Sequence, residues 1–252
     1  MPKLFVYRSA AMTKRAPPPS PPGTETKKRQ RVTPHPYETR VAQYLHRFRE
    51  HKQNAKNEHG GGAQKEPDMA IMQALRDGLR LDDMDEACES LRSFIIGYGV
   101  NRTFKGMGAG ARVFEPVVRH LRARRAVQMQ LSTPEAIMAE VGDLAGACKA
   151  AGFNHNVSFA SKCLCMLGAH VPILSSECVA YLGLKEGTKY TAEYVDAWTA
   201  EYERHRVGYE AAAERLMGAT ERDCGLSATW VAMRGLDQHM VVVGAPMRKK
   251  AG

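Results

Sequence analysis

The sequence predicts an all-α fold, and three observations support this. Apolar residues recur at spacings of three and four along most of the chain after residue 36, as they do on the buried face of a helix. Residues typical of helix starts, such as Thr133-Pro134-Glu135, precede these segments, and glycines follow several of them. No run of alternating β-branched residues is long enough to require a strand. With 44% apolar and 25% charged residues, the 252-residue chain has an ordinary globular composition.

The first element is a tail, residues 1–36, which we expect to be disordered. Five prolines between residues 17 and 22 exclude a helix or sheet there. A basic cluster follows, made of Lys27, Lys28, Arg29 and Arg31. Such a cluster indicates a nuclear-import signal or an arm that contacts phosphates, and a solvated linker is the alternative.

Residues 37–56 have the pattern of a basic amphipathic helix. Val41, Tyr44, Leu45 and Phe48 share one face, and basic residues fill most of the rest. The glycines at 60–62 then predict a hinge. We therefore expect residues 37–66 to form a separate segment before the main helical domain, residues 67–247.

The main domain is predicted to contain eight further helices. They are expected near residues 68–79, 82–98, 113–126, 133–151, 157–168, 175–183, 191–217 and 226–242. Thr133 and Thr191 stand at expected N-caps, and four glycines stand where C-terminal caps are expected, Gly152, Gly168, Gly183 and Gly218. Four aromatic residues at spacings of four we interpret as core packing, Tyr190, Tyr194, Trp198 and Tyr202.

A second basic block spans residues 101–125, with seven Lys/Arg against one acid. Three glycines between residues 106 and 110 precede its helix, which carries Arg119, Arg122, Arg124 and Arg125. Backbone N–H groups of a glycine-rich loop and guanidinium groups both suit phosphate contacts. The block thus predicts a nucleic-acid surface, and a solvated helix face is the alternative.

Residues 156–184 predict an apolar helix, a proline-containing turn and a second short helix. The pattern consists of Phe159-Ala160-Ser161-Lys162 with Leu164 and Leu167, then Pro172-Ile173, Ser176, Val179 and Leu182-Gly183-Leu184. It resembles the core of the helix-hairpin-helix DNA glycosylase superfamily, and within it the divergent group described as similar to 8-oxoguanine DNA glycosylase. A weaker similarity runs from Leu236-Asp237 to Gly244, where that group ends in a helix with Leu-Asp and a late glycine.

The resemblance implies a helix-hairpin-helix glycosylase-like domain that turns a base out of the DNA duplex and cleaves its glycosidic bond with help from a carboxylate. It also implies a lysine nucleophile. Here the sequence departs from the group, because Ser158 matches the nucleophilic Lys and Ser175 matches the Asp after the turn. Lys162, four residues after Ser158, and Glu177, two after Ser175, are the substitutes at hand. The alternatives are a surface lysine and an acid that favours the start of its helix.

His155 and Phe159 open the first hairpin helix, and the resemblance makes them candidates for a wall that stacks on an extruded base. Other chemistries lack their motifs: the sequence contains no zinc-type Cys-x-x-Cys pairing, no P-loop, no dinucleotide fingerprint and no Gly-x-Ser-x-Gly. We expect no cofactor and no metal. No run approaches the ~18 apolar residues of a membrane span, so no membrane association is expected.

The leading hypothesis is a nuclear or otherwise intracellular DNA-binding protein related to base-excision glycosylases, with altered or lost chemistry, and DNA is its expected partner. A non-enzymatic helical interaction module in the nucleus is the alternative. An enzyme acting on a nucleotide-linked substrate is a third option, which the sequence neither supports nor excludes.

Overall fold

Helices account for nearly all the regular structure in the part of the chain that the computed structural model describes, residues 37–50, 67–98, 100, 104, 110–125, 131 and 133–251, and no strand occurs in these ranges. The all-α prediction is confirmed. The helices are α1 (Tyr37–Arg49), α2 (Asp68–Gly78), α3 (Met84–Gly97), the 3-10 helix η3 (Ala111–Phe114), α4 (Glu115–Ala123), α6 (Pro134–Ala150), α7 (Val157–Met166), α8 (Ser176–Tyr181), α9 (Ala192–Leu216), α10 (Ala219–Asp223) and α11 (Ala228–Ala251).

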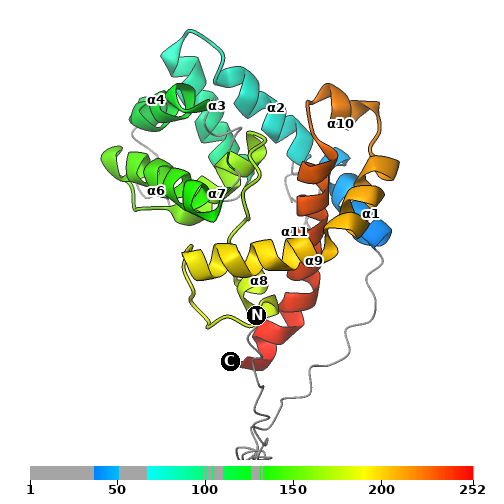
Figure 1. Ribbon diagram of the computed structural model, residues 1–252. Coiled ribbons are helices and arrows are strands. Elements are labelled where there is room, and N and C mark those ends of the chain that lie inside the picture. Colours follow the sequence, from blue (N-terminus) through cyan, green and yellow to red (C-terminus); the bar gives the residue numbers. More distant parts are fainter. Residues whose placement is uncertain are drawn as a thin grey trace, which may run out of the picture. The chain divides into compact units, whose positions relative to one another are not determined.

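The helices form two packed groups (Figure 1). In one group, α3 packs against α2, η3 and α4, and α6 packs against α4 and α7. In the other, α11 is the central helix and contacts α1, α8 and α9. Contacts of α1 with α2 and of α6 with α9 join the two groups.

Helix α1 packs within the same unit as the helices that follow it, whereas the sequence predicted a separate segment over residues 37–66. The unit runs from Pro36 to Gly252. The predicted apolar face is buried, with Val41 and Phe48 fully inaccessible, because α11 and α9 cover it. Arg47 and Arg49 reach other helices, donating to Gln238 and Glu221. The tail and the glycine hinge lie outside the described residues.

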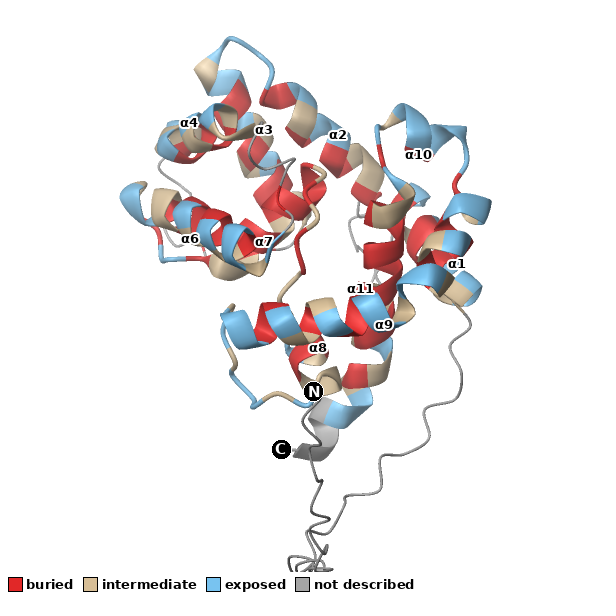
Figure 2. Ribbon diagram, in the orientation of Figure 1, coloured by how far each residue is buried: buried red, intermediate tan, exposed pale blue. Residues whose placement is uncertain are grey.

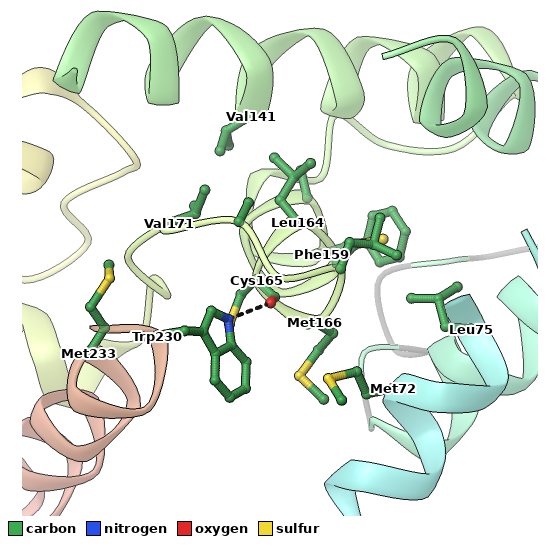
Figure 3. Close-up of a cluster of buried hydrophobic side chains, with 14 of the residues drawn as sticks. Met72, Leu75, Val141, Phe159, Leu164, Cys165, Met166, Val171, Trp230 and Met233 are labelled. Carbon is green, nitrogen blue, oxygen red and sulfur yellow. Dashed lines mark hydrogen bonds between the residues drawn. The ribbon is translucent and has the colours of Figure 1, made fainter. Parts of the chain in front are cut away.

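The core reaches its centre at α7, most of whose residues are buried. A helix that is apolar on most sides must be covered on most sides. Figure 3 shows α7 side chains between those of α2, α6 and α11, with the Trp230 indole N–H donating to the Cys165 carbonyl oxygen at 2.9 Å. In Figure 2 the buried faces of the helices point toward one another. The first helix of the hairpin, α7, is thus held in the core, and the turn and α8 extend from it.

Two of the predicted helix caps differ from the structure, and α11 continues to Ala251, past its predicted end near residue 242. Thr133 caps α6 by accepting from the Ala136 N–H at 3.2 Å, whereas Thr191 makes no such side-chain bond at α9. Gly168 and Gly183 end the two hairpin helices with φ of +101° and +70°, and Gly152 does the same after α6. Gly218 is not a C-cap: it precedes α10, a helix of five residues that the sequence did not predict, and its φ is −93°.

Candidate functional site

The polar edge of α7 supplies the first half of the site. Asn156 caps this helix, its side-chain oxygen accepting from the Phe159 N–H at 3.0 Å. Ser158 and Lys162 follow, one turn apart and half-buried, on a helix whose other sides lie in the core. The Lys162 ammonium nitrogen donates to the Ser158 hydroxyl at 2.8 Å.

The start of α8 supplies the second half. The Ser175 hydroxyl accepts from the Cys178 N–H at 3.1 Å and so caps the helix. Glu177 is half-buried in the first turn. Gly244 of α11 holds this turn in place: a Cβ there would lie 2.0 Å from the Glu177 carbonyl oxygen, so only glycine admits this approach of the two helices.

A pocket of about 580 Å³ opens between these two edges. Its lining comes from α7, the turn before α8, α8 itself, the following loop and α11: Ser158, Lys162, Leu174, Ser175, Ser176, Glu177, Val179, Ala180, Gly183, Leu184, Glu186, Gly187, Thr188 and Met247. The structure therefore brings together all four residues singled out as catalytic candidates, Ser158, Lys162, Ser175 and Glu177. The volume is in the range of small-molecule sites.

Burial shifts the pKa of the pocket amine. Removal from water lowers the pKa of Lys162 below its ordinary value, and the negative potential of Cys178 and Glu177 offsets this only in part. A lower pKa gives a larger fraction of neutral amine at a given pH, and the neutral amine is the nucleophilic form. The pocket thus combines an amine, three serine hydroxyls and two carboxylates, Glu177 and Glu186.

Two residues predicted for a base-stacking wall do not line the pocket. Phe159 is fully buried, its ring centroid 4.9 Å from that of Phe104 and 6.2 Å from that of Phe94. It faces the core because α2, α3 and α6 cover the apolar sides of α7. His155 is exposed in the loop before the helix. Neither ring lines the α7–α8 pocket, and a role for the two in stacking on a base stays a prediction.

Three of the four arginines predicted to bind nucleic acid have intramolecular partners. Arg119 donates twice to Glu115, at 2.9 and 2.6 Å. Arg124 donates to the buried Glu140 at 2.5 Å. Arg122 donates to carbonyl oxygens after α2, that of Leu79 at 3.1 Å and that of Leu81. These internal partners leave fewer free guanidinium groups on the helix, nucleic-acid binding by the four arginines stays a prediction, and Arg125 is considered below. The tail residues Lys27, Lys28, Arg29 and Arg31 lie outside the described residues.

Sequence reasoning missed the outer parts of the pocket. Met247 comes from the last turns of α11, some 70 positions after α8, and no local pattern announces this contact. The loop Gly183–Thr188 closes another side, and its only signal was the glycine that ends α8. Long-range packing supplies Met247, whereas the loop follows α8 directly in the sequence.

All six cysteines are free thiols, and within the described ranges no three His, Cys, Asp or Glu side chains are placed to bind a metal ion. None of the described helices combines the length and apolarity that a membrane crossing needs. Comparisons with protein-family models, curated proteins and solved structures found no match to the chain.

Proposed function

We propose that this chain is a DNA-binding protein of the base-excision type, related to the helix-hairpin-helix glycosylases, whose α7–α8 pocket receives a nucleotide turned out of the duplex. The observation that carries the proposal is the convergence of Lys162 and Glu177 on one pocket at the hairpin. Ser158 and Ser175 occupy the positions where the related enzymes have Lys and Asp. Lys162 reaches back to Ser158, so its amine lies one helical turn from the position of the missing nucleophile.

The residues favour altered chemistry, directed at an abasic sugar. Ser175 caps α8 and has no carboxylate, so the group that assists glycosidic cleavage in the related enzymes is missing at this position. An amine of lowered pKa needs no such help to attack an aldehyde. In the proposed step, neutral Nζ of Lys162 adds to C1′ of the ring-opened sugar. The Glu177 carboxylate takes one proton from Nζ and passes it to the carbonyl oxygen, a second proton comes from solvent, and the oxygen leaves as water, which leaves an iminium linkage.

Covalent trapping tests this proposal. The full chain is incubated with a duplex that contains one abasic site, and borohydride reduces any iminium to a stable amine bond. We expect a protein–DNA adduct with the wild type, loss of the adduct in Lys162→Gln, and slower formation in Glu177→Gln. Lys149→Gln, on the exposed surface of α6, removes the same charge elsewhere and should behave as the wild type. An undiminished adduct in Lys162→Gln would refute the role of this amine.

A second candidate is a helical interaction module without enzymatic activity. The internal partners of Arg119 and Arg124 favour it, because paired arginines contribute less to a DNA-binding surface. Salt dependence separates the two candidates. DNA binding should weaken steeply with salt, and deletion of residues 1–36 should flatten that slope if the tail contacts phosphates. An interaction module that uses its tail only for import should show no DNA affinity once the tail is removed.

A further inference from the structure

A second, smaller pocket of about 370 Å³ lies away from the amine site, where the ends of three helices meet. Leu79 and Arg80 follow α2, Leu121 and Arg122 belong to the last turns of α4 and Arg125 follows it, and Leu167 follows α7. Three leucines and three arginines thus form the whole lining. An apolar floor with guanidinium groups around it suits a compact anion.

The three arginines that line this pocket have few or weak interactions with carboxylates. Arg122 uses its Nε and Nη2 on backbone carbonyls, which fixes the side chain and leaves Nη1 outside those two bonds. Arg80 faces Asp77 at 3.4 Å, and both side chains are more than half exposed, so this pair is weak. Within the described part of the chain, no hydrogen bond or ion pair engages Arg125.

A fourth arginine, Arg76, does not line the pocket but lies near two of the arginines that do. Arg76 donates to the Cys224 carbonyl oxygen at 2.6 Å. Its pKa is lowered by burial and then by Arg125 and Arg80, so the arginines are close enough to repel one another. The rest of the basic block differs: Arg119 has Glu115, and Arg124 has Glu140. Among the described residues, the only carboxylate paired with an arginine of this pocket is Asp77, in the weak, exposed pair with Arg80.

We infer that the arginine pocket of Arg80, Arg122 and Arg125 binds a phosphate group, supplied by the backbone of a nucleic acid. Guanidinium groups bind phosphate oxygens through paired N–H bonds. When an anion enters between positive charges that the fold holds together, it also relieves their mutual repulsion. The choice of nucleic acid as the source of the phosphate rests on the proposed function, whereas the anion site itself does not. Free phosphate offers the same chemistry from another source.

Two binding measurements on the full chain test the inference. In the first, affinity for a fluorescent duplex is measured over a range of salt for the wild type, Arg125→Gln and Arg80→Gln. Loss of one phosphate contact should weaken binding roughly tenfold at 0.1 M salt and reduce the salt slope by about 1. Arg206→Gln, an exposed α9 arginine paired with Glu203, removes one charge elsewhere and should change neither quantity.

In the second measurement, inorganic phosphate and pyrophosphate are titrated while the arginine Nε–Hε resonances are followed by NMR. A selective effect of Arg125→Gln on the duplex supports the backbone source. Phosphate binding that Arg125→Gln weakens, with duplex affinity unchanged or absent, supports the anion site and overturns the nucleic-acid source. If neither ligand responds to Arg125→Gln, the inference is overturned. The borohydride adduct reports on Lys162 and Glu177 of the α7–α8 pocket, and at saturating duplex Arg125→Gln should still form it, so the two proposals can fail separately.

Discussion

Lys162 donates a hydrogen bond from Nζ to the Ser158 hydroxyl at 2.8 Å, one turn back along α7. The bond holds the amine at the half-buried edge of a helix that is otherwise core. Such a position costs stability while the amine is charged, and the cost falls when the amine is neutral.

Lys162→Met should stabilise the fold at pH 7, by roughly 0.5–1 kcal/mol. The pKa of Lys162 is lowered in the folded state, so the unfolded chain binds more protons between the lowered and the ordinary lysine pKa. Wild-type stability therefore rises with pH across that window. The advantage of Lys162→Met should shrink over the same range in thermal unfolding at a series of pH values. The exposed Lys149→Met is the control, and a pH-independent advantage would contradict the argument.

Gly244→Ala should destabilise the fold by about 2 kcal/mol or more, because the new methyl group meets the Glu177 backbone carbonyl at 2.0 Å and α8 must move. Gly142→Ala in α6 is the matched control. No atom lies within 4 Å of its added Cβ, and it should gain up to about 1 kcal/mol from helix propensity. Denaturant unfolding measures both. Equal effects at the two positions would show that contact with α8 is not what requires glycine at 244.

Helix positions could be predicted from the sequence because the apolar periodicity and the caps are local. Asn156 and Thr133 cap through residues three positions along, so the same short segment specifies and satisfies the bond. The sequence singled out Lys162 and Glu177 as substitutes, but their convergence on one pocket is a result of the structure and was not predicted.

Partners that lie far apart in sequence could not be predicted. Glu140 is 16 positions after Arg124, and nothing in either segment indicates that the acid will be buried beneath the guanidinium group. Phe159 was assigned to a pocket for a related reason: spacing shows which residues share a face of α7 but not that neighbouring helices cover nearly every face. Glu115, four residues before Arg119, was the one local signal overlooked.

Arg49→Met should cost about 2 kcal/mol and make stability less sensitive to acid. Arg49 donates to both carboxylate oxygens of Glu221, at 2.6 and 2.7 Å, and the Glu221 side chain is fully buried whereas Arg49 is 39% exposed. The bonds from Arg49 lower the pKa of Glu221. Their stabilisation is therefore present at neutral pH and is lost as the pH falls below the ordinary glutamate pKa of about 4.3.

The measurement is urea unfolding at pH 7 and at pH 3. The difference between wild type and Arg49→Met should be smaller at pH 3. Arg215→Met is a suitable control, because its partner Glu38 is mostly exposed and the pair contributes little. A loss of equal size at both pH values would show that Arg49 stabilises through packing and not through the carboxylate.

Phe159→Leu should cost about 1–2 kcal/mol and Phe159→Ala about 3–5 kcal/mol of folding free energy, because the ring fills a closed cluster with Phe94 and Phe104. His155→Ala should change stability by less than about 0.5 kcal/mol, since His155 is exposed. Urea unfolding measures all three, and DNA affinity is then measured on the folded Phe159→Leu protein. If Phe159 is only a core residue, the DNA affinity of Phe159→Leu should equal that of the wild type once the folded fraction is taken into account. If Phe159 stacks on a base, Phe159→Leu should lose roughly 1–3 kcal/mol of DNA-binding free energy while the stability of the fold is unchanged. That result would restore Phe159 to the pocket wall.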